Sequence, residues 1–167
     1  MRPPGQNDPG LLGEGDMQNA VTERTPLHLW IVGGLATLWN CIGPLDYTMT
    51  RMHNDGWLKA SMPEVDPQAV YSYIDSFPIW ASTGWALGVW LGLIGSILLL
   101  MRNRWSVPAY GISLIGAIIG LGYQMMNPPN WPGMGSGMSA IMPIVIIVVA
   151  IGLFLYARAM SNRGVLK

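Results

Sequence analysis

Four long apolar runs constrain this chain of 167 residues more than any other feature of its sequence. They extend over residues 27–47, 77–101, 108–126 and 140–157. Each is close to the ~20 residues that a helix needs to cross a bilayer core of ~30 Å. Barrel strands would alternate apolar and polar residues, whereas residues 144–149 are apolar without interruption. We therefore predict an all-α membrane protein, a four-transmembrane-helix bundle, because helices satisfy their own backbone polar groups in lipid.

The composition agrees with a chain that faces lipid rather than water. Hydrophobic residues make up 51% of the chain and charged residues 11%, against roughly 25% charged in an average soluble domain. The formal net charge is zero, so the chain lacks the concentrated basic surface that binding to phosphates requires. We expect the lipid bilayer as a partner and no nucleic acid.

Residues able to begin a helix precede each apolar run. Asp66-Pro67, with apolar residues at helical spacing after it, predicts a short amphipathic helix on the outer side, leading into the second span. Asn54-Asp55-Gly56 predicts a turn before that helix. The predicted caps of the four spans are Thr25, Ser76, Ser106 and Ser139, and Pro143 is expected in the first turn of the last span.

The basic residues predict the orientation. Seven of the nine lie in the two ends or in the second connection, and two lie in the other connections. The first group is Arg2, Arg24, Arg102, Arg104, Arg158, Arg163 and Lys167; the second is Arg51 and Lys59. Because basic residues accumulate on the cytoplasmic side, both termini are expected there. This predicts a flexible cytoplasmic N-tail (1–25), a membrane domain (26–157) and a basic cytoplasmic C-tail (158–167).

Small residues recur every fourth position along the second span. Such a stripe allows a neighbouring helix to approach closely, and the third span offers a matching ridge. The stripe is Gly84, Gly88, Gly92 and Ser96, and the ridge is Gly116 and Gly120. The stripe indicates either packing inside one bundle or an interface with a partner subunit. Trp85 and Trp90 lie away from the stripe and deep in the span, where they could face lipid, a partner subunit or a cofactor such as a quinone or pigment.

Two polar residues of the first span are candidates for function. An ionisable residue at membrane depth is expensive and commonly functional, and Asp46 is the candidate here. If the helix continues, Met49, Thr50 and His53 share its face. Asp46 is either a proton or metal position or an interfacial carboxylate paired nearby. Asn40, which lies deeper, is expected to bond to another helix or to line a transport path.

Known site chemistries find little support. Met49 and His53 indicate a weak soft-ligand site for Cu(I), since thioether and imidazole suit that ion, but methionine also fills irregular apolar gaps. There is no phosphate-binding glycine loop, zinc-spaced Cys/His set or catalytic Ser/His/Asp arrangement. We therefore expect no enzyme, and no motif implies a cofactor.

Several stretches are similar to one family of membrane proteins. They are Leu38-Trp39-Asn40 with Gly43 and Asp46-Tyr47, then Phe77-Pro78-Ile79-Trp80, and then residues 102–108 with Ser113-Leu114. Over residues 27–126 the chain resembles a family of small bacterial inner-membrane proteins with four transmembrane helices and no established function, some of them automatically labelled sugar transporter. The resemblance implies a multi-pass protein of the bacterial inner membrane and supplies no catalytic residues.

Three functions remain open at this point. The first is a non-catalytic accessory or interaction subunit of a larger bacterial membrane complex, respiratory or photosynthetic. The second is a small-solute or ion transporter with Asn40 and Asp46 along its path. The third is an extracytoplasmic Cu(I)-binding membrane protein.

Overall fold

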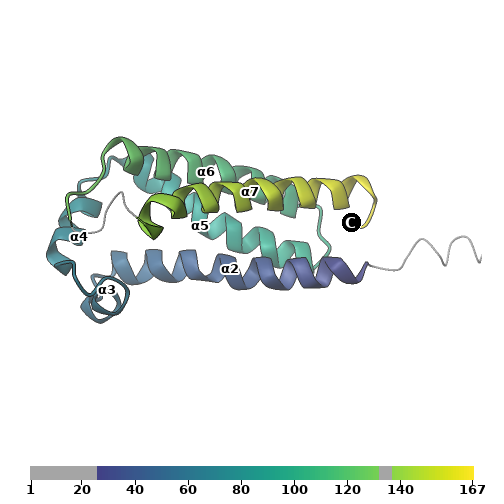
Figure 1. The fold of residues 1–167 in the computed structure, drawn as a ribbon. Coiled ribbons are helices and arrows are strands. Elements are labelled where there is room, and N and C mark those ends of the chain that lie inside the picture. Colours follow the sequence, from purple (N-terminus) through teal and green to yellow (C-terminus); the bar gives the residue numbers. More distant parts are fainter. Residues whose placement is uncertain (1–25, 132–136) are drawn as a thin grey trace, which may run out of the picture.

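The chain is helical throughout the part that the computed structural model describes, residues 26–131 and 137–167 (Figure 1). No strand occurs in that part, so the predicted all-α class is confirmed. The predicted flexible N-tail, residues 1–25, lies outside it. The helices in chain order are α2 (Leu27–Arg51), α3 (Asp55–Ser61), α4 (Pro67–Asp75), α5 (Ile79–Leu100), α6 (Ser106–Met126) and α7 (Met138–Asn162).

Within these residues, three helices are long and apolar enough to cross a membrane: α5, α6 and Ala140–Asn162 of α7. They correspond to the second, third and fourth predicted spans. α2 corresponds to the first and has 25 residues, yet it does not belong to this group. Its length suffices, so the difference lies in its composition, because His28, Asn40 and Asp46 interrupt the apolar run. That α2 also crosses the membrane, and the sidedness of the chain, remain predictions.

The four long helices pack in the order α2, α5, α6, α7. α2 and α7 come together at one end, where Nδ1 of His28 and the Tyr156 hydroxyl oxygen lie 2.6 Å apart. Next to this contact Leu29 is fully buried in a cluster with Ala157 and Met160. The opposite end of the fold carries α3 and α4 (Figure 1). Between the two ends, α2 and α7 line opposite sides of a cleft.

Glycines bring the backbones of α5 and α6 into direct contact. A Cβ atom at Gly116 would lie 2.7 Å from the carbonyl oxygen of Gly84 and 2.7 Å from the amide nitrogen of Gly88. One at Gly120 would lie 3.1 Å from Cα of Trp85. The stripe and its ridge thus pack against each other inside the chain, which is the first of the two alternatives that the spacing left open.

The C-terminal residues fold back onto the turn between α5 and α6. The Arg104 amide donates to the carbonyl of Lys167 at 2.9 Å, and the Lys167 amide donates to the carbonyl of Arg102 at 2.7 Å. Leu166 is buried. The segment predicted as a basic C-tail, residues 158–167, is thus partly helical and partly docked, and it gathers basic residues at one end of the fold. We refer to this end as the arginine end.

The connection before α5 holds two short helices, of which one was expected. Asp66 caps α4 by accepting from the amide of Gln68 at 3.1 Å, and Pro67 is its first residue, so this predicted helix is confirmed. The predicted turn at Asn54 is instead the start of α3, where the Asn54 side chain accepts from the amide of Trp57 at 2.9 Å. An Asn followed by Asp-Gly suits a helix start as well as a turn, which explains the difference.

A cluster of side chains fastens this connection to the end of α2. His53 stacks on Tyr71 with ring centroids 4.1 Å apart, and its Nε2 atom lies 3.5 Å from Asp75. Arg51 approaches the same carboxylate at 3.6 Å. The Tyr71 hydroxyl donates to Asp55 at 2.8 Å, and burial together with this carboxylate raises the pKa of Tyr71 to about 12. The phenol therefore stays protonated at neutral pH and holds α4 to α3.

The serines expected to cap the spans do not cap them. Ser76 ends α4 and donates to the Tyr73 carbonyl, while the N-cap of α5 is Pro78. Ser106 is the first residue of α6, and its buried hydroxyl caps nothing. α7 begins two residues earlier than predicted, so Pro143 lies beyond its first turn. The side chains of Thr25 and Ser139 lie outside what the structure describes. Helix ends here follow burial rather than the nearest serine, because packing outweighs a single cap.

The Gly116→Ala substitution tests the contact between α5 and α6. The new methyl group must displace backbone atoms of α5, so we expect a loss of about 1–3 kcal/mol in the free energy of unfolding and a lower thermal midpoint in detergent. The matched control is Gly122→Ala on the same helix, where a Cβ meets nothing within 4 Å. It should leave the midpoint unchanged or raise it, since alanine favours helix. Equal midpoints for the two variants would contradict the close contact.

Candidate functional site

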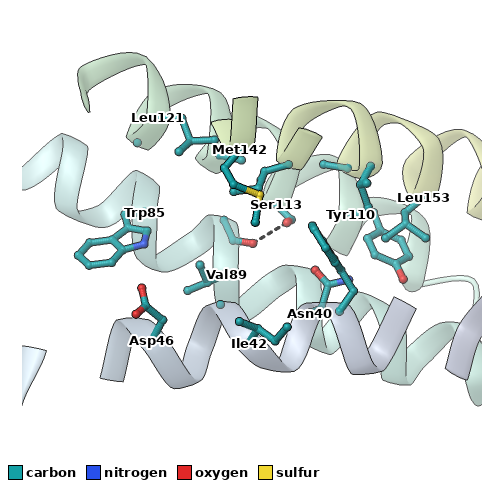
Figure 2. A pocket seen from close by; sticks show the side chains of 18 residues that line it. Asn40, Ile42, Asp46, Trp85, Val89, Tyr110, Ser113, Leu121, Met142 and Leu153 are labelled. Atoms are coloured by element: carbon teal, nitrogen blue, oxygen red, sulfur yellow. Dashed lines mark hydrogen bonds between the residues drawn. The ribbon is translucent and has the colours of Figure 1, made fainter. Parts of the chain in front are cut away.

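A cleft lies between α2 and α7, which we call the helical cleft (Figure 2). Its volume is about 280 Å³. α5 and α6 line its inner wall, and α2 and α7 form its two sides. Its lining is mostly apolar and includes Trp39, Ile42, Val89, Leu121, Met142, Ile146 and Leu153.

A second cavity of about 500 Å³ continues the helical cleft toward α3 and α4, and we call it the mouth cavity. The two volumes adjoin, because five residues line both of them: Asp46, Trp85, Leu121, Met142 and Ile146. The connection between α3 and α4 contributes Glu64 to the mouth cavity, and α6 contributes Gln124. The space thus changes from an apolar cleft to a mouth with more polar groups.

A hydrogen-bond network crosses three helices at the deep end of the helical cleft. The Asn40 side-chain amide donates to the Ser96 hydroxyl at 3.0 Å and to the Ala36 carbonyl at 2.8 Å. The Tyr110 hydroxyl also donates to Ser96, at 3.0 Å, and Ser96 donates to the carbonyl of Gly92. Asn40 therefore bonds to another helix, which is one of the two alternatives that the sequence left open. Its position against Gly92 explains the lack of a side chain there, since a Cβ would lie 2.6 Å from Oδ1 of Asn40.

Asp46 lies at the junction of the two volumes. Its Oδ1 atom accepts a hydrogen bond from the indole nitrogen of Trp57 at 2.9 Å, and its side chain is half-buried. Figure 2 shows the carboxylate directed toward Trp85 on α5. Trp85 in turn makes an edge contact with Tyr47, with ring centroids 4.8 Å apart. A carboxylate among aromatic rings at the mouth of an apolar cleft is typical of a ligand-binding pocket, in which a few polar groups orient the ligand.

Other residues singled out in the sequence lie elsewhere. Trp90 is 44% exposed on the outer side of α5 and lines neither volume. Met49 sulfur accepts from the Asn54 amide at 3.7 Å. The sequence placed His53 on the same helix face as Asp46 and Met49 if the helix continued. α2 ends at Arg51, so His53 does not lie on that face. Its backbone turns instead with φ of 52°, and its ring faces Tyr71.

No group of three or more His, Cys, Asp or Glu side chains that could hold a metal ion occurs in the described part of the chain. Met49 and His53, the two weak copper ligands, make separate contacts with protein groups.

Several residues of the site carried no signal in the sequence. Trp57 binds Asp46 from α3, a helix that was not expected, and Tyr110 reaches Ser96 from the start of α6. Met142 and Ile146 belong to an apolar run that gives no indication of which side faces the cleft. Asn54 could have indicated the start of α3, but not the contact that Trp57 makes with Asp46.

Comparison with known proteins gives no relative: no family model, no curated protein and no solved structure matches this chain. The resemblance to small four-span inner-membrane proteins therefore stays a prediction. The site has to be interpreted from its own geometry.

The Asn40→Ala substitution tests the network across α2, α5 and α6. It removes the donor to Ser96 and should lower the free energy of unfolding in detergent by about 1 kcal/mol, the usual value for such bonds in membrane proteins. Thr37→Ala is the control, because Thr37 bonds only to the carbonyl of Gly33 in its own helix. A double-mutant cycle with Ser96→Ala should give a non-zero coupling energy. Additive effects would show that the bond does not contribute.

Proposed function

We propose that this chain is a non-catalytic accessory subunit of a larger bacterial membrane complex and that it binds the apolar chain of a lipid-soluble ligand in the helical cleft. The observation that carries the proposal is the cleft itself, an apolar space open between α2 and α7. In a bilayer this opening would face the acyl chains, so a lipid-soluble molecule could enter from the side. Respiratory and photosynthetic complexes, which handle such molecules, are the expected hosts.

The size of the cleft favours a slender ligand over a partner helix. A helix with its side chains is ~10 Å or more across, which is too wide for a cleft of about 280 Å³ between four helices. A single alkyl or isoprenoid chain suits this volume and its apolar walls.

The packing at the arginine end favours binding over transport. There, Leu29, Leu99, Tyr110, Ala157, Met160 and Leu166 form a buried cluster. A transport path that continued from the helical cleft toward the arginine end would have to pass the hydrogen-bond network of Asn40 and Ser96 and then this cluster. The alternative of a small-solute transporter is therefore the weaker proposal.

The accessory role rests on α7. Only 6% of the residues in its most apolar stretch are buried within the chain, and α7 packs mainly against α6. This leaves most of its surface for lipid or for a neighbouring subunit, and we propose a neighbouring membrane subunit.

We further propose that the arginine end faces the cytoplasm of a bacterial inner membrane. Support comes from the pairing of the C-terminal residues with the turn between α5 and α6, which gathers Arg102, Arg104 and Lys167 on one side. Reporter fusions check the sidedness. We expect a C-terminal fluorescent protein to be active in bacterial cells and a C-terminal alkaline phosphatase to be inactive, because the phosphatase needs the periplasm; the opposite pattern would refute this orientation.

A matched pair of isoleucines on α7 tests the binding proposal. Ile146 lines both volumes, whereas Ile144 is 58% exposed on the outside of the same helix. The probe is hexadecanol with a photoreactive diazirine in its chain, added to the full chain in phosphatidylcholine nanodiscs. We expect saturable labelling of cleft peptides in the wild type and in Ile144→Trp, and loss of most of it in Ile146→Trp, because the indole fills the cleft.

Purification from native membranes in a mild detergent separates the two parts of the proposal. Co-migration with other membrane subunits supports the accessory role, and migration as a lone chain would remove it. Labelling that does not saturate in the wild type, or that is equal in the two tryptophan variants, would remove the binding role.

A further inference from the structure

Building on the proposed function, we infer that the ligand of the helical cleft is a cationic amphiphile: a single apolar chain that ends in an ammonium group held against Asp46 in the mouth cavity. The chain of this ligand extends down the helical cleft toward Asn40. Its positive head lies where the helical cleft meets the mouth cavity.

The charges that line the space select the sign of the head group. Two carboxylates line it, Asp46 and Glu64, and no Lys, Arg or His of the described chain does. The basic residues nearest in sequence, Arg51 and His53, approach Asp75 instead. A phosphate, sulfate or carboxylate head would meet only like charge there, and like charge opposes binding. An ammonium head meets opposite charge.

The aromatic lining of the mouth cavity points to the same chemistry. Four aromatic side chains line it, namely Tyr73, Phe77, Trp85 and Trp131. They form a continuous group, with ring centroids 5.0 Å apart for Tyr73 and Phe77, 5.4 Å for Tyr73 and Trp131, and 6.3 Å for Phe77 and Trp85. Aromatic faces attract ammonium groups, and rings around a carboxylate are a common way to recognise them.

Asp46 is better placed than Glu64 to hold the head group. It lines both volumes and is half-buried, whereas Glu64 is exposed at the rim. Trp57 occupies Oδ1 of Asp46 and fixes the carboxylate, while Oδ2 accepts no hydrogen bond from any described residue. An ion pair that is partly removed from water is stronger than one in bulk solvent. The second oxygen is therefore the expected ligand of the ammonium.

Matched probes test the inference. The full chain in phosphatidylcholine nanodiscs is labelled with two diazirine amphiphiles of equal chain length, hexadecyltrimethylammonium and hexadecanoate. The ratio of their half-saturation concentrations is measured in the wild type and in Asp46→Asn, because comparing ratios cancels their unequal partition into the bilayer. We expect the preference for the ammonium to fall about tenfold in Asp46→Asn, since the ion pair between the ammonium and the carboxylate becomes a contact between the ammonium and a neutral amide.

Two further variants control for folding and for net charge. Asp46→Glu keeps the charge and should keep most of the preference. Asp66→Asn loses the same charge outside the cleft and keeps a residue that can cap α4, so its ratio should equal that of the wild type. A changed thermal midpoint identifies a variant that is misfolded. If Asp46→Asn is misfolded, the ratio measured in Asp46→Glu decides, because loss of the preference with the charge kept would refute the inference.

The outcomes distinguish the two proposals. If the ratio is the same in Asp46→Asn and the wild type while neutral hexadecanol still labels the cleft saturably, the cationic ligand is refuted and the apolar-chain site stands. If no probe labels the cleft saturably, the site itself is refuted and the inference falls with it. A tenfold change confined to Asp46→Asn supports both.

Discussion

The close contact of α5 and α6 is the constraint on which the other features of this fold depend. Where Gly84 and Gly88 face Gly116, backbone atoms replace side chains at the interface, so the two helices form a thin central pair. The remaining two long helices pack on opposite sides of this pair: α2 packs against α5, and α7 packs against α6. Because lipid provides no hydrophobic drive between helices, this close van der Waals packing is a principal source of their association.

The second determinant is how the polar groups of α2 are paired. The side-chain nitrogen of Asn40 donates to the Ser96 hydroxyl and to the Ala36 carbonyl of its own helix. Asn40 therefore ties α2 to α5 without leaving a buried donor unpaired. Asp46 is satisfied only in part, through Trp57, and it faces the cleft. The same helix therefore carries one polar group that stabilises the fold and one that is available to a ligand.

The cleft itself follows from where α2 and α7 touch. His28 and Tyr156 join them at the arginine end, and at the other end the cluster of His53, Tyr71 and Asp75 fastens α3 and α4 to α2 without reaching α7. The two helices are thus joined at the arginine end, and beyond that contact they line the sides of the cleft. Under our proposal, a lipid-soluble ligand enters through this cleft, and the more polar mouth cavity sets the direction in which it binds.

The sequence by itself determined the helical class, the four long segments and the start of α4 at Asp66-Pro67, because apolar runs and local capping depend on neighbours in the chain. It also indicated the glycine contact, since a spacing of four places these residues on one face. Tertiary structure decided the rest. Only the packing of α7 shows that Ile146 faces a cleft, and only α3 brings Trp57 to Asp46, because such contacts join residues whose separation in the chain carries no periodic signal.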